Sequence, residues 1–374
     1  MKIKSFKLER LAAIYEFSAK YALSCTDSES FSIGELLALE RDGSEKLQKQ
    51  WLGYTEPLGL PSLRKQVSDL YENISQDEVI IHSGAGESMF LFMNVALNAG
   101  DHVIVQVPCY QSLIELPRAI GCKVTPWLAD EQNGWEFDIA FLEKNIRKNT
   151  KAIIINAPHN PTGNLMSKEK FQQIIDIAKS KDCLVYSDEV FRFLEYDDEN
   201  RLPSACDLYD NAVSSGGVAK SFGLGGLRIG WIATKNKKIY DAMASYRDYT
   251  TISNSAPSEY LTEIALRHKE KLLERNKIIA QENLALLQNF FTKYDAIFNW
   301  NLPKTSTVMF PSFKKDVNVE KFSEDLVKSK GVYLIPSTVF DYGNKNFRIG
   351  YGRKNFPKVL AIFEEYIKEK LFNK

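Results

Sequence analysis

Residues 152–187, AIIINAPHNPTGNLMSKEKFQQIIDIAKSKDCLVYS, decide the fold class of this chain. The stretch begins with the apolar run 152–156 and ends with the similar run 183–187, and both are typical of strands buried in a parallel sheet. Between them, apolar side chains recur at the spacing of one helix face, at Phe171, Ile174, Ile175 and Ala178. Ser167 precedes this helix as a suitable N-cap. A strand, a helix and a second strand in this order predict an α/β fold.

The same pattern continues on both sides of this stretch. Further buried strands are expected at residues 79–81, 102–107 and 212–215. A helix is expected at 87–98, with Gly100 as its stop signal. We therefore predict a mostly parallel central sheet sandwiched by helices.

The chain changes character near residue 258, where long charged helices begin. Beyond them, strands are expected at 307–310 and 347–351, and helices at 319–330 and 357–371. The first 40 or so residues are too few for a core of their own, so we expect them to pack with this tail or across the entrance of a site. We predict a large domain of residues 41–280 and a smaller α+β domain formed by both termini, residues 1–40 and 281–374.

The composition excludes several classes of protein. The chain has 374 residues, with 48 Lys plus Arg against 48 Asp plus Glu, so no overall field attracts nucleic acid or an anionic membrane. No apolar stretch approaches the length of a signal core or a membrane span, and we expect a cytoplasmic protein with small-molecule partners. Five cysteines without close pairing argue against a disulfide framework and a zinc cluster, so no metal is expected.

Three residues, Asn160, Asp188 and Lys220, each follow the end of an expected strand. Functional groups of open α/β sheets gather at the carboxyl ends of the strands, so these three can converge in one crevice. A lysine amine forms a Schiff base with an aldehyde, and a carboxylate can hold a pyridine nitrogen protonated. An asparagine on a turn offers a neutral donor that suits a phenolate oxygen.

The motifs around these residues resemble a known family. Asn160-Pro161-Thr162-Gly163, Ser187-Asp188-Glu189-Val190, and Lys220 followed by Gly226-Leu227-Arg228-Ile229-Gly230-Trp231 are similar to the signature of the class I/II, fold type I pyridoxal phosphate (PLP) aminotransferases. The order and spacing match from about Tyr54 to Arg348. The resemblance implies PLP as cofactor, with Lys220 as the internal aldimine lysine and proton carrier. It also implies Asp188 as the partner of the pyridine nitrogen and Asn160 as the donor to the ring hydroxyl.

Further roles follow from the same resemblance. Arg228 is similar to the phosphate-binding arginine, the backbone of Ala85 and Gly86 to the rest of the phosphate cup, and Tyr110 to the aromatic residue that stacks on the ring. A glycine-containing loop that opens a helix presents free N–H groups to a dianion, which agrees with the cup.

Two more residues are assigned by the resemblance. Arg348 is similar to the arginine that grips the substrate carboxylate beside Asn160, a task suited to a planar guanidinium. Tyr54 is similar to the tyrosine that reaches the phosphate of the neighbouring subunit, which implies a homodimer with shared active sites.

The implied reaction is transfer of an amino group from an amino acid to a 2-oxo acid by a ping-pong mechanism through the Lys220 aldimine. An alternative is a PLP-dependent lyase, decarboxylase or cyclase of a specialised pathway. Related C–S lyases commonly show Asp-Glu-Ile-His where this chain has Asp188-Glu189-Val190-Phe191, which disfavours that branch. Some transcription regulators carry this fold behind a DNA-binding head, but the first 40 residues show no helix-turn-helix pattern.

The chain also departs from the family pattern. Phe191 stands where a tyrosine usually donates to the ring hydroxyl, so we predict an internal aldimine that stays more protonated near neutral pH. Ala219 and Gly217 replace expected hydroxyl residues. The candidates to supply those hydroxyls are Ser83, Ser88, Ser215 and Ser221. The side chains that could select the substrate, or could equally belong to the core, are Tyr15, Phe17, Tyr21, Cys25, Tyr333 and Phe340.

Overall fold

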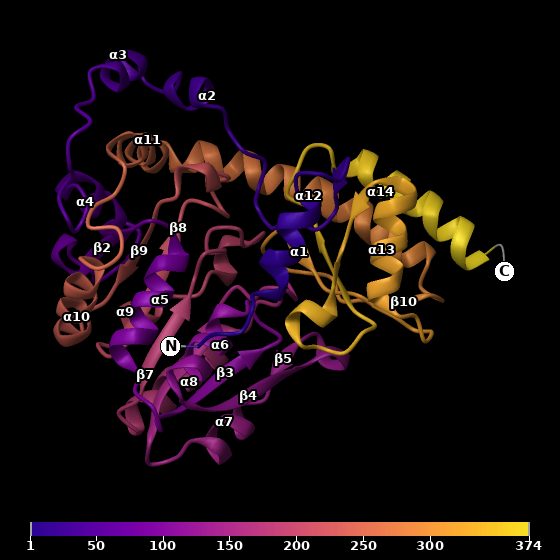
Figure 1. Ribbon diagram of the computed structural model, residues 1–374, viewed down its shortest axis with the longest axis horizontal. Coiled ribbons are helices and arrows are strands. Elements are labelled where there is room, and N and C mark those ends of the chain that lie inside the picture. The colour runs from indigo at the N-terminus through magenta and orange to yellow at the C-terminus, as the bar shows by residue number, and fades with distance from the viewer. Residues whose placement is uncertain (1, 373–374) are drawn as a thin grey trace.

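The computed structural model describes residues 2–372 (Figure 1). Within them, an eight-stranded sheet has the order β2-β9-β8-β7-β6-β3-β4-β5. The strands are β2 (Val79–His82), β3 (His102–Val107), β4 (Lys123–Asp130), β5 (Glu136–Phe137), β6 (Thr150–Asn156), β7 (Leu184–Asp188), β8 (Ala212–Gly217) and β9 (Gly230–Ala233). The neighbouring pairs β8-β7, β7-β6, β6-β3 and β3-β4 are parallel. At the two ends of the sheet, β9 is antiparallel to both β8 and β2, and β5 is antiparallel to β4. The predicted mostly parallel α/β fold is confirmed.

The stretch 152–187 folds as the predicted unit, in which β6 leads through α8 (Lys168–Ser180) to β7. Ser167 caps α8 by accepting a hydrogen bond of 3.2 Å from the backbone N–H of Lys170. The four apolar residues of the predicted helix face are all buried. Their burial fixes α8 on one face of the sheet, because the opposite helix face is polar.

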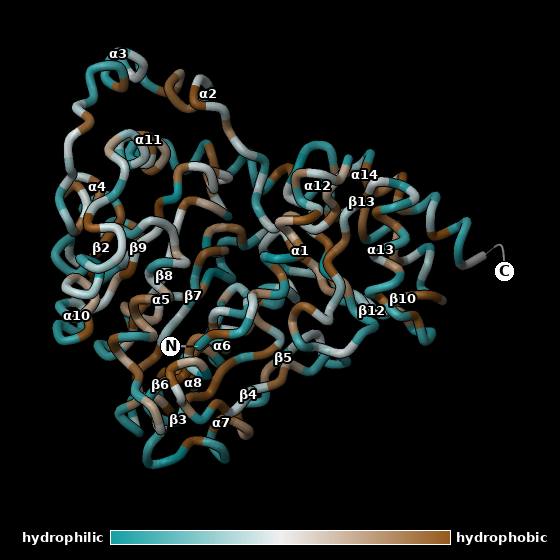
Figure 2. The backbone as a smooth tube through the Cα atoms, viewed as in Figure 1, coloured by the Kyte–Doolittle hydropathy of each residue, from teal (hydrophilic) through white to brown (hydrophobic). Residues whose placement is uncertain are grey.

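Helices cover both faces of the sheet because successive strand side chains point to opposite sides. Ile153, Ile155 and Val185 pack toward α8 and α7 (Ile139–Asn145), whereas Ile154 and Tyr186 pack toward the other face. The helices on that second face are α5 (Ala85–Ala96), α6 (Ser112–Ile120) and α10 (Lys237–Arg247). In Figure 2 the strands β3 and β6 lie in hydrophobic colour inside a more hydrophilic periphery.

The predicted helix 87–98 is displaced by two residues, since α5 begins at Ala85 and ends at Ala96. Gly84 has a φ of +87° and places the helix start directly after β2, and Leu97 is already extended. Gly100, with a φ of +91°, therefore turns the connection to β3 and does not cap the helix. The prediction was wrong because a glycine stop signal marks a turn without fixing its distance from the last helical residue.

The remaining helices are α1 (Lys7–Tyr15), α2 (Ile33–Leu37), α3 (Gly43–Gln48), α4 (Pro61–Ser68), α9 (Ala205–Leu208), α11 (Ala256–Arg267), α12 (Lys269–Lys293), α13 (Val319–Lys330) and α14 (Phe356–Ile367). The remaining strands are β1 (Tyr21–Ala22), β10 (Phe298–Asn299), β11 (Val308–Met309), β12 (Ser312–Phe313), β13 (Val332–Tyr333), β14 (Ile335–Pro336) and β15 (Phe347–Gly350). The long α12 extends from the main sheet toward α13 and α14 (Figure 1).

The two ends of the chain share one apolar core. Leu23 is buried together with side chains of α12, α13 and α14, and β1 pairs in parallel with β13. α12 runs through residue 280 without a break, so the domain bounds 41–280, 1–40 and 281–374 stay a prediction. Among the described residues, no helix combines the length and apolar character needed to cross a membrane.

Candidate active site

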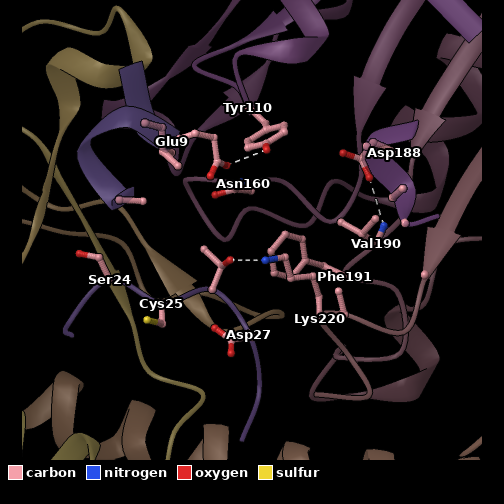
Figure 3. A pocket seen from close by; sticks show the side chains of 18 of the residues that line it. Glu9, Ser24, Cys25, Asp27, Tyr110, Asn160, Asp188, Val190, Phe191 and Lys220 are labelled. Carbon is pink, nitrogen blue, oxygen red and sulfur yellow. Dashed lines mark hydrogen bonds between the residues drawn. The ribbon is translucent and has the colours of Figure 1, made fainter. Parts of the chain in front are cut away.

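A cavity of about 480 Å³ lies where the carboxyl ends of β6, β7 and β8 meet the N-terminal segment. Asn160, Asp188 and Lys220 all line it, so the structure brings the three residues together as expected (Figure 3). Asp188 is the last residue of β7, and the other two follow β6 and β8. Their convergence has a simple cause, since parallel neighbouring strands deliver their carboxyl ends to the same edge of the sheet.

Asp188 carries a buried carboxyl group whose loss of hydration is offset by few interactions with the protein. Its side chain is 5% exposed, and Oδ1 accepts a hydrogen bond of 3.3 Å from the backbone N–H of Val190. Burial raises the pKa of Asp188 to about 7, and the Val190 hydrogen bond and the charge of Lys220 offset this only in part. A protonated nitrogen facing this carboxylate would favour its ionised form, so the position suits a group that brings its own positive charge.

Arg348 and Asn160 both line the cavity and contact each other. Arg348 Nη1 donates to Asn160 Oδ1 at 3.2 Å, and Nη2 donates to the backbone carbonyl of Ser24 at 3.1 Å. The guanidinium is 5% exposed, and its Nε has no hydrogen-bond partner in the part of the chain that the structure describes. Burial lowers the pKa of Arg348. A buried guanidinium without a counter-ion favours an incoming anion such as a carboxylate.

Lys220 reaches across the cavity to the N-terminal segment. Its Nζ donates to Thr26 Oγ1 at 2.6 Å, over a sequence separation of 194 residues. Burial lowers the pKa of Lys220, although the nearby carboxylate of Asp27 opposes the shift. A lowered pKa increases the fraction of neutral amine, which is the form that attacks an aldehyde carbonyl.

The start of α5 and Arg228 form a cradle for an anion. Ala85, Gly86 and Arg228 line the cavity, and the N-terminal N–H groups of the 12-residue α5 carry a positive dipole end. A Cβ atom on Gly84 would lie 2.6 Å from Arg228 Nη2, and one on Gly230 would lie 2.4 Å from the backbone nitrogen of Ala85. The glycines therefore let backbone and guanidinium come close together, and the donor set fits a phosphate.

The four serines considered for extra hydroxyl contacts do not line the cavity. Ser88 and Ser215 hydrogen-bond to each other at 2.9 Å, and the Ser221 hydroxyl donates to the carbonyl of Arg192 at 2.5 Å. The backbone N–H of Ser83 donates a hydrogen bond to Glu87 Oε2 at 2.7 Å. The serine and threonine that do line the cavity are Ser24 and Thr26. No local signal marks them, because they arrive by pairing of β1 with β13.

The two aromatic positions differ in their surroundings. Tyr110 lines the cavity, and its hydroxyl donates to Glu9 Oε1 at 2.8 Å. Phe191 also lines the cavity and is 1% exposed, so it brings a ring and no donor to this wall. Tyr54 does not line this cavity; it is 83% exposed and lies in a separate surface hollow with Asn254.

The N-terminal residues contribute more to the cavity than the sequence predicted. Glu9 and Glu16 line it, and neither was predicted as a site residue. Of the six side chains considered for substrate selection, Cys25 and Tyr333 line the cavity, whereas Phe17 is 93% exposed. Phe340 lies beneath the Arg348 guanidinium, 5.5 Å from it. The remaining two do not line the cavity: Tyr15 packs on Tyr333 at 5.9 Å, and Tyr21 lies in β1.

Comparison with known proteins identifies the family. The profile of the family described as aminotransferase class I and II matches residues 26–356. The capreomycidine synthase of Streptomyces vinaceus is 26% identical over 353 residues, which are 93% of this chain and 90% of that protein. A PLP-dependent aminotransferase from Streptococcus suis superposes with a TM-score of 0.93 at 30% identity, over 99% of both chains. The PLP-dependent cyclase OrfR superposes with a TM-score of 0.91 at 25% identity, over 99% of this chain and 98% of that chain.

The cavity carries the donor set that PLP requires. The cradle at α5 and Arg228 fits its phosphate, the buried Asp188 carboxyl fits its pyridine nitrogen, and the half-buried Lys220 amine fits its aldehyde. These contacts agree with the cofactor of the family. The chain is a PLP-dependent enzyme and belongs to the aminotransferase class I and II family.

Proposed function

We propose that this enzyme transfers the amino group of an amino acid to a 2-oxo acid in a ping-pong cycle. The observation that carries the proposal is the placement of Lys220 and Arg348 in one cavity with Asp188. An amine that can carry a proton, an anchor for a carboxylate and a buried acid are the three groups that amino-group transfer needs from the protein.

Each residue has a separate task in this proposal. PLP, when bound, supplies an electron sink for the bond that breaks at the substrate α-carbon. Lys220 Nζ would take the α-proton and later give it back, because its lowered pKa leaves a fraction of the amine neutral and able to act as a base. Arg348 holds the substrate carboxylate, and Asn160 holds the ring oxygen. Asp188 keeps the pyridine nitrogen protonated.

A second candidate is a cyclase that uses the same cofactor. It is favoured by the 25% identity with the PLP-dependent cyclase OrfR, and the capreomycidine synthase, at 26% identity, is a relative whose name is not that of an aminotransferase. A cyclase shares the binding groups and differs in what happens after proton removal, so the cavity residues do not separate the two. Product analysis does: transfer leaves the pyridoxamine form of the cofactor and a 2-oxo acid, whereas cyclisation regenerates the starting cofactor.

We also propose a homodimer in which Tyr54 completes the partner's phosphate site. Tyr54 is 83% exposed and lies outside its own cavity, and Trp51 and Leu52 beside it are 77% and 79% exposed. Large apolar side chains exposed in a group are typical of an interface. Sedimentation should give twice the mass of the 42.6 kDa chain, and a monomer that binds PLP with full affinity would contradict this proposal. A cytoplasmic address stays a prediction.

The function is tested by single-turnover spectroscopy. We expect Lys220→Ala to lack the visible absorption of the bound cofactor. In the wild-type enzyme, addition of the amino acid substrate should convert this absorption to the pyridoxamine spectrum. Restoration by a 2-oxo acid would complete the ping-pong cycle. Substrate consumption without a 2-oxo acid product would reject transamination in favour of the cyclase.

A further inference from the structure

Two carboxylates in the cavity have no task in the proposed function. Glu9 lies in α1 and Glu16 directly follows its last residue, Tyr15. Both line the cavity together with Ala12, which lies between them on the same side of the helix. A separation of seven residues places two side chains two turns apart on one helix face. Figure 3 shows Glu9 across the cavity from Asp188, with Tyr110 and Asn160 between them.

Neither carboxylate forms an ion pair with any residue from 2 to 372. Glu9 accepts one hydrogen bond of 2.8 Å from the neutral Tyr110 hydroxyl. Glu16 has only the thiol of Cys25 at 4.0 Å. Asp27, a third carboxylate of this wall, differs because Arg353 Nη2 donates to it at 2.8 Å. Each glutamate therefore has acceptor capacity left over, since a carboxylate offers about four lone-pair positions.

The charges of the cavity point to a cationic ligand. Its lining contains three cationic side chains, Lys220, Arg228 and Arg348. In the proposed function each of them faces the cofactor or the substrate α-carboxylate, so this lining offers no cationic side chain of the same subunit to the two glutamates. A half-buried negative charge without a partner is unfavourable, and a ligand that brings the opposite charge removes that penalty.

The hydroxyl of Tyr333 also supports a polar ligand at this wall of the cavity. Tyr333 lines the cavity and is 3% exposed, and its hydroxyl has no hydrogen-bond partner among residues 2–372. Its ring packs on Tyr15 at the end of α1, with ring centroids 5.9 Å apart. Buried hydroxyls are normally satisfied, so an unsatisfied one on this wall indicates a polar ligand atom.

We propose that the side chain of the amino acid substrate is cationic, an ammonium or guanidinium group that Glu9 and Glu16 bind while Arg348 holds the α-carboxylate. This inference rests on the proposed function, because it takes the amino acid as the ligand of this cavity. Among the described residues of one subunit, no arginine or lysine besides Lys220, Arg228 and Arg348 lines the cavity.

Paired substrates test the charge directly. Single-turnover rates of the holoenzyme are compared for L-arginine against L-citrulline and for L-ornithine against L-norleucine, pairs that differ in charge and little in shape. We expect the second-order rate constant of this single turnover to be about tenfold or more higher for the cationic member than for its neutral partner in at least one pair, the value of a charge-assisted hydrogen bond. Equal values in both pairs, or a preference for L-glutamate, would overturn the inference.

Variants then assign the preference to the two residues. Glu9→Gln, Glu16→Gln and the double variant should reduce the cationic-to-neutral ratio stepwise toward one. Glu282→Gln, which alters an exposed carboxylate of α12 far from the cavity lining, is the matched control and should keep the wild-type ratio. A merely structural role would lower both members of a pair equally and leave the ratio unchanged, which would contradict the proposal.

A binding measurement separates this inference from the reaction. Calorimetry with 2-methylornithine, which lacks the α-hydrogen, reports recognition without turnover, and the double variant should bind it about tenfold more weakly or worse. If 2-methylornithine binds but no amino acid yields a 2-oxo acid, transamination is wrong and the inference stands. If neutral amino acids are transaminated as well as their cationic partners, the inference is wrong and the proposed function stands.

Discussion

Arg348 Nη1 and Asn160 Oδ1 are joined by a hydrogen bond of 3.2 Å between residues 188 positions apart in the sequence. Because the amide oxygen of Asn160 is held by Arg348, its amide nitrogen is the end left to donate. The proposed substrate anchor therefore also orients the proposed donor to the cofactor ring. A second hydrogen bond helps to hold Asn160 in this orientation, since its backbone N–H donates to Asn156 Oδ1 at 2.7 Å.

The first prediction concerns this pair. Arg348→Lys keeps the charge but removes the planar fork, and we expect KM for the amino acid to rise about 10- to 100-fold. The visible spectrum of the bound cofactor should shift as well, because Asn160 loses its orienting partner. Arg267→Lys, which alters a surface pair with Glu40, serves as the control and should change neither quantity. A raised KM with an unchanged spectrum would mean that Asn160 is oriented by its backbone alone.

The second prediction concerns the stability of the enzyme after removal of PLP. Burial raises the pKa of Asp188 to about 7 from 3.8, so the folded apoenzyme holds a proton there that the unfolded chain releases. Stability from this group is complete below pH 4 and is lost as the pH rises to about 7, by up to about 4 kcal/mol. Apo Asp188→Asn should therefore be more stable than the wild-type apoenzyme at pH 8 and equal to it near pH 4. Parallel curves of Tm against pH would contradict this account.

The same variant should behave oppositely toward the cofactor. The amide of Asp188→Asn lacks the charge that pairs with a protonated pyridine nitrogen, so the variant should bind PLP more weakly than the wild type at pH 8. Equilibrium dialysis measures this Kd. Together the two results would show that the apoenzyme gives up stability for a carboxylate that becomes favourable only when the ring is bound.

The third prediction concerns Phe191, which is buried and lines the cavity. Phe191→Tyr adds a hydroxyl where related enzymes usually carry one. We expect the pH at which the cofactor's visible band changes to fall by about one unit, because the new donor stabilises the negative ring oxygen. Spectrophotometric titration measures the midpoint. A wild-type midpoint that is already unusually acidic, or a variant midpoint that does not move, would show that Phe191 does not limit the donors to the ring.

The fourth prediction concerns the close approach of β9 to α5. Gly230→Ala places a Cβ atom 2.4 Å from the Ala85 backbone nitrogen, so the start of α5 has to move. We expect a loss of about 1–3 kcal/mol in the free energy of unfolding and a weaker Kd for PLP. Gly226→Ala is the matched control, since a Cβ atom there meets nothing within 4 Å. Unchanged PLP affinity in Gly230→Ala would place the phosphate away from α5.

The sequence predicted the parts of the site that depend on local pattern. Strand and helix periodicity located β6, α8 and β7. Asn160, Asp188 and Lys220, at or after the carboxyl ends of β6, β7 and β8, converge because parallel strands end at one edge of the sheet. The helix at α5 was misplaced by two residues, since a glycine stop signal marks a turn without fixing its distance from the last helical residue.

Local pattern carried no information on the wall opposite the sheet. Thr26 meets Lys220 across 194 residues and Ser24 meets Arg348 across 324 because β1 pairs with β13 and carries the N-terminal segment over the cavity. Glu9 in α1 and Glu16, which directly follows α1, line the same cavity. Pairing over such distances is set by burial of the shared apolar core and not by the residues adjacent in sequence. The motifs therefore predicted the proposed cofactor site, whereas the carboxylates proposed to face the substrate come together only when the two ends of the chain pack against each other.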